Sequence, residues 1–218
     1  LLRFLQNMKK EGKARFTGFS THTDMARLLR EAAKSNLHDV VLTSYNFTHS
    51  NELKGAIASA AESGIGIVAM KTQAGGYKGK ETEGLNPHQA ALRYVLKDEH
   101  VAVAIPGVKT IGQIEQCAAV MGTLMTREDM ADLKKYHSHI QGRFCTMCGG
   151  CQGECPKGIA HCDLLRALMY HYGYKDERLA SEALTNGDNL AKLRVCSECS
   201  SCSVACIRGL DIQAQLKK

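Results

Sequence analysis

Cysteines are concentrated near the end of the sequence, and their spacing indicates the chemistry they could perform. Nine of the ten cysteines lie between residues 145 and 206 of the 218-residue chain. Two runs share the spacing C-x2-C-x2-C-x3-C, namely Cys145, Cys148, Cys151, Cys155 and Cys196, Cys199, Cys202, Cys206. This spacing is typical of bacterial ferredoxins, because three thiolates at every third residue let one tight loop wrap three corners of an iron–sulfur cube. The sequence therefore predicts two [4Fe–4S] clusters.

The fourth cysteine of each run is expected to serve the other cluster, as it does in two-cluster ferredoxins. The predicted ligands are Cys145, Cys148, Cys151 and Cys206 for the first cluster, and Cys196, Cys199, Cys202 and Cys155 for the second. Structural zinc is the alternative, but it usually takes paired Cys-x2-Cys knuckles with four ligands per ion. Two triplets that each need a distant fourth thiol favour iron–sulfur clusters over zinc.

Two cysteines lie outside the runs. Cys162 could line the cluster pocket, but it is interpreted as a buried structural cysteine, and Cys117, on a predicted helix, is expected to be inert. Among the neighbouring residues, Gly153 permits a tight turn inside the first run and Gly209 permits one after the second. Pro156 follows the first run, whereas Ile207 stands at the corresponding place in the second.

The segment between the two runs, residues 159–194, has a helical pattern. Leu164, Leu165, Leu168 and Met169 fall on one apolar stripe, which is typical of a helix packed on a core. Composition shifts abruptly to cysteine and glycine after Gln141–Arg143. We therefore predict a mostly α-helical, ferredoxin-like domain over residues 143–218.

Residues 1–142 alternate between apolar strands and helices. Strands are predicted at 15–20, 40–44, 64–70 and 101–105, and helices at 25–34, 52–63, from Pro87, 111–121 and 127–139. Thr23 or Asp24, Asn51 and Thr110 are the predicted helix caps. The nearly all-apolar strands favour a parallel sheet covered on both faces. Four consecutive βα units fit either a doubly wound sheet or half of a (β/α)₈ barrel, and periodicity alone does not separate the two.

Composition narrows the function classes. The chain is 44% hydrophobic and 23% charged, which is typical of a globular protein, and it contains no apolar run long enough for a membrane span. The net charge of +6 is spread along the chain without basic stretches interleaved with aromatics, so nucleic-acid binding is not expected. Clustered thiols predict a reducing compartment or a cluster that is loaded before export, and the cytoplasm is the expected location. The opening residue, Leu1, lies within a helical pattern and is interpreted as part of a longer chain.

Four segments carry a resemblance to a known family: 11–22 (EGKARFTGFSTH), 44–47 (SYNF), 64–76 (GIGIVAMKTQAGG) and 101–117 (VAVAIPGVKTIGQIEQC). They resemble the last four βα units of the aldo/keto reductase family in order and spacing. With the cysteine runs, the chain is similar to a subgroup that carries a C-terminal iron–sulfur domain. The resemblance implies the C-terminal half of a (β/α)₈ barrel over residues 1–142, followed by a ferredoxin-type domain.

The resemblance also implies NADP(H) binding at the C-terminal ends of the strands. By position, the resemblance implies that Ser20 contacts the nicotinamide amide and that Gly75 and Gly76 approach the pyrophosphate. The adenosine-phosphate end would be bound by Pro106, Gly107, Lys109, Thr110 and Gln113. Lys109 and Thr110 also open a predicted helix, and a helix N-terminus with a lysine favours phosphate. Lys71, at a strand end, is a further candidate for an anionic cofactor or substrate. The family's catalytic residues come from the first four strands, so no catalytic residue is assigned here.

Two functions follow as hypotheses. The first is an oxidoreductase that couples a nicotinamide- or substrate-binding barrel to electron transfer through the two clusters. The second is a non-catalytic electron-transfer subunit that uses the barrel as a docking scaffold. The expected partners are a small-molecule substrate, a redox partner protein, or both.

Overall fold

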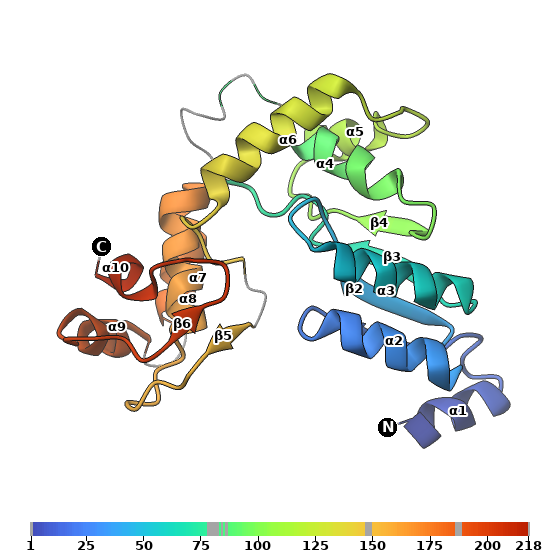
Figure 1. The fold of residues 1–218 in the computed structure, drawn as a ribbon, viewed down its shortest axis with the longest axis horizontal. Helices are drawn as coiled ribbons and strands as arrows, with labels where there is room; N and C mark the ends of the chain where they lie inside the picture. The colour runs from blue at the N-terminus through green and yellow to red at the C-terminus, as the bar shows by residue number, and fades with distance from the viewer. Residues whose placement is uncertain are drawn as a thin grey trace. The chain divides into compact units, whose positions relative to one another are not determined.

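The structure is a computed structural model that describes residues 2–77, 83, 85, 87–146, 150–185 and 189–217 (Figure 1). The chain divides into two compact units. Unit 1 comprises Leu1–Ala74 with Asn86–Leu133, and unit 2 comprises Gly75–Leu85 with Lys134–Lys218. The division falls inside helix α6 (Arg127–Ile140) and assigns the Gly75–Leu85 segment to the cysteine-containing unit. Among the described residues, none of the helices has the length and apolar character that crossing a membrane requires.

Unit 1 is built on a four-stranded parallel sheet in the order β1-β2-β3-β4. The strands are β1 (Gly18–Thr21), β2 (Val40–Ser44), β3 (Gly66–Met70) and β4 (Val103–Ile105). Each strand pairs with its successor, for example Ser20 with Leu42 and Met70 with Ile105. A doubly wound sheet reverses its strand order near the middle, whereas a (β/α)₈ barrel keeps the sequential order. The four βα units therefore have the order of a barrel.

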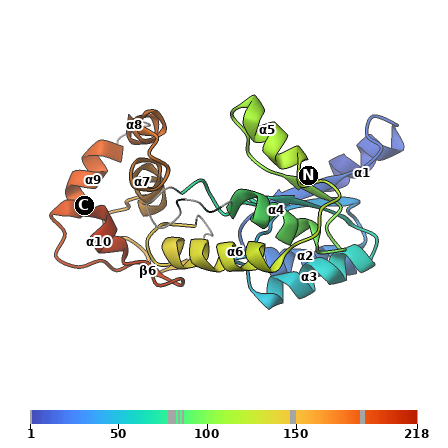
Figure 2. The same cartoon turned by 90° about the horizontal axis from the view of Figure 1, so that it is seen from above.

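The core of unit 1 lies on one face of this sheet. Helices α2 (Met25–Ser35), α3 (Asn51–Glu62) and α4 (Pro87–Leu96) contribute buried side chains to it, and Figure 2 shows α2 and α3 on the same side of the sheet. Along β2 and β3, Val41 and Ile67 are fully buried, whereas their neighbours Leu42 and Val68 remain partly exposed. The prediction that both faces are covered is therefore wrong for the described strands. Sequential crossovers of one hand place the helices on a single face, and in a closed barrel the other face lines the interior.

The helix ends show which caps the sequence predicts well. Thr110 caps α5 (Ile111–Ala118) in a reciprocal capping box, as predicted. The cap of α3 is Ser50, whose hydroxyl accepts from the Leu53 N–H at 3.4 Å, so the prediction of Asn51 is wrong by one residue. Asp24 stands at the start of α2 without a side-chain cap hydrogen bond, and its carboxylate pairs with Arg27.

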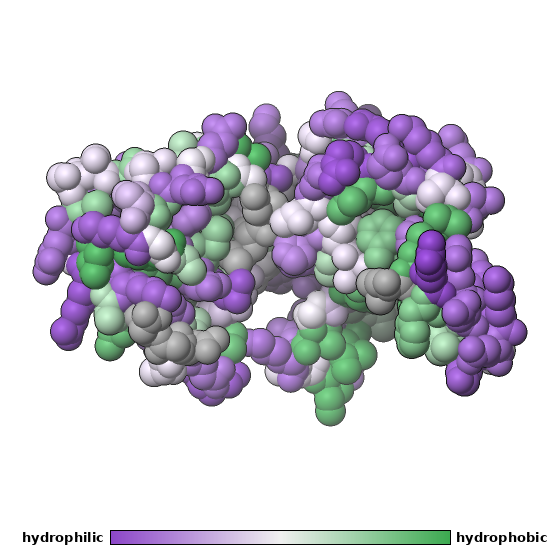
Figure 3. Space-filling view, turned by 90° about the horizontal axis from the view of Figure 1, so that it is seen from below, coloured by the Kyte–Doolittle hydropathy of each residue, from purple (hydrophilic) through white to green (hydrophobic). Residues whose placement is uncertain are grey.

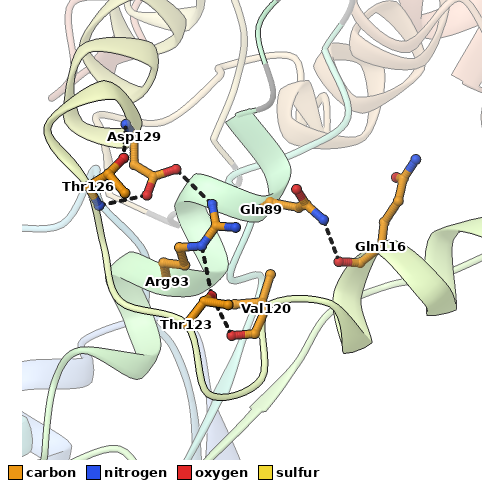
Figure 4. Close-up of polar contacts among 7 residues, drawn as sticks. All are labelled: Gln89, Arg93, Gln116, Val120, Thr123, Thr126 and Asp129. Atoms are coloured by element: carbon orange, nitrogen blue, oxygen red, sulfur yellow. Dashed lines mark hydrogen bonds and ion pairs between the residues drawn. The ribbon is translucent and has the colours of Figure 1, made fainter.

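A polar network fixes the loop between α5 and α6 within unit 1 (Figure 4). The Arg93 guanidinium in α4 donates to the Asp129 carboxylate at 2.8 Å and to the Thr123 hydroxyl at 3.0 Å. Asp129 also accepts from the Thr126 N–H at 2.8 Å, and the Asp129 N–H donates to the Thr126 hydroxyl at 3.0 Å. Burial by itself raises the pKa of the Asp129 carboxyl, but the hydrogen bonds from Thr126 and the charge of Arg93 outweigh it and hold the pKa below its ordinary value.

Apolar side chains also remain on the surface of unit 1. Ile111 and Ile114 in α5 are 77% and 54% exposed, and Met121 and Leu124 in the following loop are 74% and 87% exposed. Figure 3 shows one face of the molecule, on which apolar surface, in green, lies among hydrophilic surface. Isolated apolar side chains are common on protein surfaces, but a group this exposed is typical of a surface that another element or chain covers.

Unit 2 is mostly helical, as predicted. Its elements are β5 (Cys151–Gln152), α7 (His161–Leu168), the π-helix η2 (Met169–Tyr174), α8 (Glu177–Thr185), α9 (Asn189–Ser197), β6 (Ala205–Cys206) and α10 (Ile212–Leu216). The leucine stripe is confirmed, since Leu164 and Leu165 are buried and Met169 is 7% exposed. Leu164 and Leu165 share a core with Val204, Leu210 and Ile212 from the end of the chain, and cysteines of both runs pack against that core.

Candidate functional site

Four thiols from both cysteine runs line one pocket of unit 2. Cys155, which follows β5, lies with Cys196 at the end of α9 and with Cys199 and Cys202 in the next loop. Pro156, Ile159, Val195 and Leu216 supply apolar walls. Gln213 in α10 lines the same pocket, and its side-chain amide donates to the Cys199 carbonyl oxygen at 2.9 Å. These are the four cysteines predicted from the spacing to share the second cluster.

The electrostatics of this pocket suit a group that binds thiolates. Backbone N–H groups of Ile159 and Lys157 point at the Cys155 sulfur and lower the pKa of its thiol. Burial raises the pKa of the Cys196 thiol, and the neighbouring thiols, Cys155 first among them, raise it further. Four like groups that repel one another as anions need a shared cation, and an iron–sulfur cluster supplies one.

The first group of cysteines is held by a short two-stranded sheet. Cys151 in β5 pairs directly with Cys206 in β6, so the third cysteine of one run faces the last cysteine of the other. Cys145 lies in the segment after α6 and packs against the same core as Cys151 and Cys206. Cys148 lies outside the described residues. The three described cysteines therefore come from both runs, as the predicted ligand set requires.

The two cysteine runs also interlock through their backbones. The Ser203 hydroxyl donates to the Glu154 carbonyl oxygen at 2.7 Å. Gly153 has a φ of +80°, and a Cβ atom there would lie 2.3 Å from the Ser203 carbonyl oxygen. Only glycine fits both the left-handed backbone and the close approach. Gly209 has a φ of +76°, which confirms the turn predicted after Cys206.

The residues predicted to bind nucleotide in unit 1 follow the carboxyl ends of its strands. Ser20 lies at the end of β1 and is exposed, and Lys71 follows β3 with a φ of 53°. Between β4 and α5 lie Pro106, Gly107, Lys109 and Thr110, with Gln113 in the first turn of α5. Because the strands are parallel, all of these residues belong to one edge of the sheet.

The N-terminus of α5 is already partly occupied by its own side chain. The Gln113 amide oxygen accepts from the Lys109 N–H at 2.6 Å and from the Thr110 N–H at 3.3 Å. These are two of the backbone donors that a phosphate at this helix end would use. Cys117, further along α5, accepts from the Gln73 amide at 3.9 Å, and burial raises the pKa of its thiol.

The Gly75–Gly76 loop is held by tyrosines within unit 2. The Tyr136 hydroxyl donates to the Gly75 carbonyl oxygen at 3.0 Å and accepts from the Tyr77 N–H at 3.3 Å. Tyr77 stacks on Phe144 with ring centroids 4.6 Å apart, and its hydroxyl donates to the Cys145 carbonyl oxygen at 3.3 Å. A continuous set of contacts therefore joins this loop to a predicted cluster ligand.

Comparison with known proteins agrees with these two parts. Residues 78–137 match the aldo/keto reductase family model. Residues 144–211 match the model of a 4Fe-4S dicluster domain. The chain joins an aldo/keto reductase region to a 4Fe-4S dicluster domain. The predicted family and fold class are thereby confirmed, and the dicluster domain supports iron–sulfur binding in this part of the chain.

Two solved structures are similar to part of the chain. The chain is similar to the aldo-keto reductase AKR11C1 from Bacillus halodurans in its holo form, with 21% identity and a TM-score of 0.48 over 62% of this chain and 54% of that one. The apo form gives 20% identity and a TM-score of 0.48, over 62% of this chain and 55% of that one. The chain thus spans about half the length of these aldo-keto reductases. Among curated proteins, no match to the chain was found.

Two features of the dicluster domain were not predicted from the sequence. Cys162 is half-buried rather than buried, and its sulfur lies 3.9 Å from that of Cys151. The interpretation of Cys162 as a buried structural cysteine is therefore wrong. The second feature is the tyrosine set around Gly75, in which the Tyr174 ring also packs edge-on against Tyr77 with ring centroids 5.3 Å apart.

Proposed function

We propose that the chain is an iron–sulfur oxidoreductase in which the dicluster domain holds two [4Fe–4S] clusters with crossed ligands. The first would be held by Cys145, Cys148, Cys151 and Cys206, and the second by Cys196, Cys199, Cys202 and Cys155. Each cluster supplies one-electron transfer when bound. A hydride carries two electrons, so a pair of clusters suits exchange with a nicotinamide or with a two-electron substrate.

The observation that carries this proposal is the position of Cys155. It belongs to the first cysteine run, yet it lines a pocket with three cysteines of the second run. A zinc knuckle would take its ligands from two adjacent pairs, which does not require such an exchange. The backbone N–H groups that point at the Cys155 sulfur are the kind of hydrogen bonds that tune iron–sulfur potentials.

In this proposal the aldo/keto reductase region binds NADP(H) at the edge of the sheet. Lys109 and Thr110 would bind the adenosine-phosphate end, and Ser20 would contact the nicotinamide amide. Lys71 would bind a negatively charged group of the cofactor or of the substrate. The Gly75–Gly76 loop would approach the pyrophosphate. Tyr136 and Tyr77 would keep that loop in place through their hydrogen bonds. The catalytic side chains of the family are outside these four βα units, so none is proposed.

A second candidate function is electron transfer without nucleotide chemistry, with the barrel region as a docking scaffold. The hydrogen bonds of Gln113 favour it, because the Gln113 amide oxygen occupies two backbone donors that a phosphate would need. Titrating the reconstituted chain with NADPH separates the two functions. Reduction of the clusters without a partner protein supports the oxidoreductase, whereas neither reduction nor NADPH binding supports the electron carrier.

The crossed ligation is tested by replacing Cys155 in the anaerobically reconstituted full chain. Cys155→Ala should lower the iron content from about eight to about four per chain and remove the second cluster, although Cys155 lies in the first run. Cys117→Ala is the matched control, because Cys117 lies in unit 1, and it should keep all the iron. Uncrossed ligation predicts the opposite result. Cys155→Ala would then remove the first cluster, and Cys206→Ala would leave the signal of the first cluster intact.

A further inference from the structure

A second set of possible metal ligands lies beside the predicted first cluster. Cys151 in β5 and His161 and Cys162 at the start of α7 offer ligand atoms that all lie within 4.8 Å of one another. The two sulfur atoms are 3.9 Å apart. Among the described residues, this is the one group of at least three such side chains whose ligand atoms all lie that close to one another. Only Cys151 belongs to the cysteine runs, so His161 and Cys162 have no assigned role.

The ring of His161 supports a ligand at this place. Its Nε2 atom is buried and has no hydrogen-bond partner within the described part of the chain. A buried polar atom that loses water without gaining a partner destabilises the fold. The backbone fixes this position, because the His161 N–H donates to the Ile159 carbonyl oxygen at 2.9 Å. A metal bound at Cys151, or the Cys151 thiol itself, would give the buried Nε2 atom a partner.

The distance between the two sulfurs suits shared access to one metal. Bonds of about 2.3 Å at a tetrahedral angle place two thiolates of one metal about 3.8 Å apart. The Cys151 and Cys162 sulfurs are 3.9 Å apart, which is the separation of two thiolates that bind one metal. Thiolate and imidazole are also the ligand types that iron and zinc take in proteins.

An internal repeat of the domain places Cys162 at a position that faces a cluster. Helix α7 begins six residues after Cys155, and α10 begins six residues after Cys206. Cys162 and Gln213 are the second residues of these helices, and Gln213 lines the pocket of the second group of cysteines. By the same repeat, Cys162 faces the first group. The first group therefore has the Cys162 thiol at the position where the second group has the Gln213 side-chain amide.

We propose that Cys162 is a reserve ligand for the iron that Cys151 binds, with His161 as the adjacent donor. This inference rests on the proposed function, since it assumes a cluster at the first group. The exchange balances without any further reactant: Cys162 gives up its thiol proton and takes the place on iron, and Cys151 leaves and takes up the proton. Such a ligand keeps the iron in place when Cys151 is lost or chemically modified. The second group has glutamine at the corresponding position and lacks this reserve.

The test uses the full chain, reconstituted anaerobically, and measures iron, sulfide and the electron paramagnetic resonance of the reduced clusters. Cys151→Ala should keep about eight irons with an altered first-cluster spectrum, because Cys162 replaces the missing ligand. Cys151→Ala combined with Cys162→Ala should fall to about four. Cys202→Ala is the matched control, because Cys202 holds the equivalent place in the second run without a reserve thiol, and it should also fall to about four.

A second experiment, which introduces a cysteine at the corresponding position of α10, tests the same role if the alanine variants fold poorly. Adding Gln213→Cys to Cys202→Ala should restore the second cluster, because it supplies the thiol that α7 supplies to the first group. If Cys151→Ala loses four irons as Cys202→Ala does, the reserve role is wrong while the two-cluster proposal stands. Failure of Gln213→Cys to restore iron also counts against the reserve role. Wild-type chain without iron overturns both proposals.

Discussion

The Tyr136 hydroxyl in α6 donates a hydrogen bond to the Gly75 carbonyl oxygen at 3.0 Å, within the same compact unit as the cysteines. The glycine pair that the aldo/keto reductase resemblance places at a pyrophosphate is therefore anchored on unit 2. Gly75 has a φ of +108°, and a Cβ atom there would lie 2.5 Å from the Tyr77 ring. The conformation of the loop therefore requires glycine at this position.

The first prediction concerns this anchor. Tyr136→Phe removes one hydrogen bond to the Gly75 carbonyl oxygen and one from the Tyr77 N–H, at a fully buried position, and should cost about 1–3 kcal/mol. Amide hydrogen exchange should speed up at Tyr77. Tyr45→Phe is the control, because it removes a buried hydrogen bond to Asp98 in unit 1 and should leave the Tyr77 amide unchanged. Unchanged exchange at Tyr77 in Tyr136→Phe would show that the hydroxyl does not hold the loop.

The second prediction concerns the interlocked cysteine runs. Gly153→Ala should reduce iron binding at both groups, because the added methyl group would meet the Ser203 carbonyl oxygen at 2.3 Å and separate the runs. The comparison is Gly158→Ala, at a φ of +64° with no other atom within 4 Å of the added methyl group. Gly158→Ala experiences only the backbone strain of about 1–3 kcal/mol. Equal iron content in the two variants would argue against the close approach.

The third prediction concerns pH and Asp129. Its folded pKa lies below the ordinary value of 3.8, so its contribution to the free energy of unfolding is present above that value and is lost as the pH falls through the folded pKa. At neutral pH, Asp129→Asn should lower the free energy of unfolding by about 1–3 kcal/mol, because charged hydrogen bonds to Arg93 and Thr126 are weakened.

Urea denaturation of the wild type and of Asp129→Asn over a pH series measures this contribution. The difference between the two chains should shrink as the pH falls below 3.8. Iron is lost from both chains alike in acid, so the difference reports on Asp129. A difference that stays constant or grows in acid would contradict the assigned direction of the pKa.

The fourth prediction concerns the exposed apolar surface of unit 1. Strands β1 and β4 each pair on one side only within the described sheet, and Ile111 and Leu124 are 77% and 87% exposed. We expect the 218-residue chain to self-associate. Ile111→Lys with Leu124→Lys should weaken association at least about tenfold, since burying each side chain contributes about 1.5–3 kcal/mol. Sedimentation velocity measures this. Met130→Lys, at a residue 51% exposed in α6, is the control, and an equal effect of that change would count against a specific surface.

The sequence predicts those features that a short segment determines by itself. The spacing of each cysteine run is dictated by the geometry of a cluster. The crossed ligand sets remain a prediction, which the placement of Cys155 in one pocket with Cys196, Cys199 and Cys202 supports. Thr110 caps α5 because its hydroxyl and Gln113 lie three residues apart, which is a local relationship. The order of the strands followed from the resemblance to the aldo/keto reductase family rather than from periodicity.

Features that depend on how distant segments pack were not predicted. The contact between Cys151 and Cys162 depends on where α7 begins relative to β5. The bond between Tyr77 and Tyr136 joins residues 59 positions apart, with nothing in either segment to indicate it. The open face of the sheet was also missed, because the inner face of a barrel and a helix-covered face both carry apolar residues.

Metal and sulfide analysis of the anaerobically purified full chain shows whether the chain holds two iron–sulfur clusters. We expect about eight irons and about eight acid-labile sulfides per chain. Two zinc ions per chain, without sulfide, would contradict this expectation.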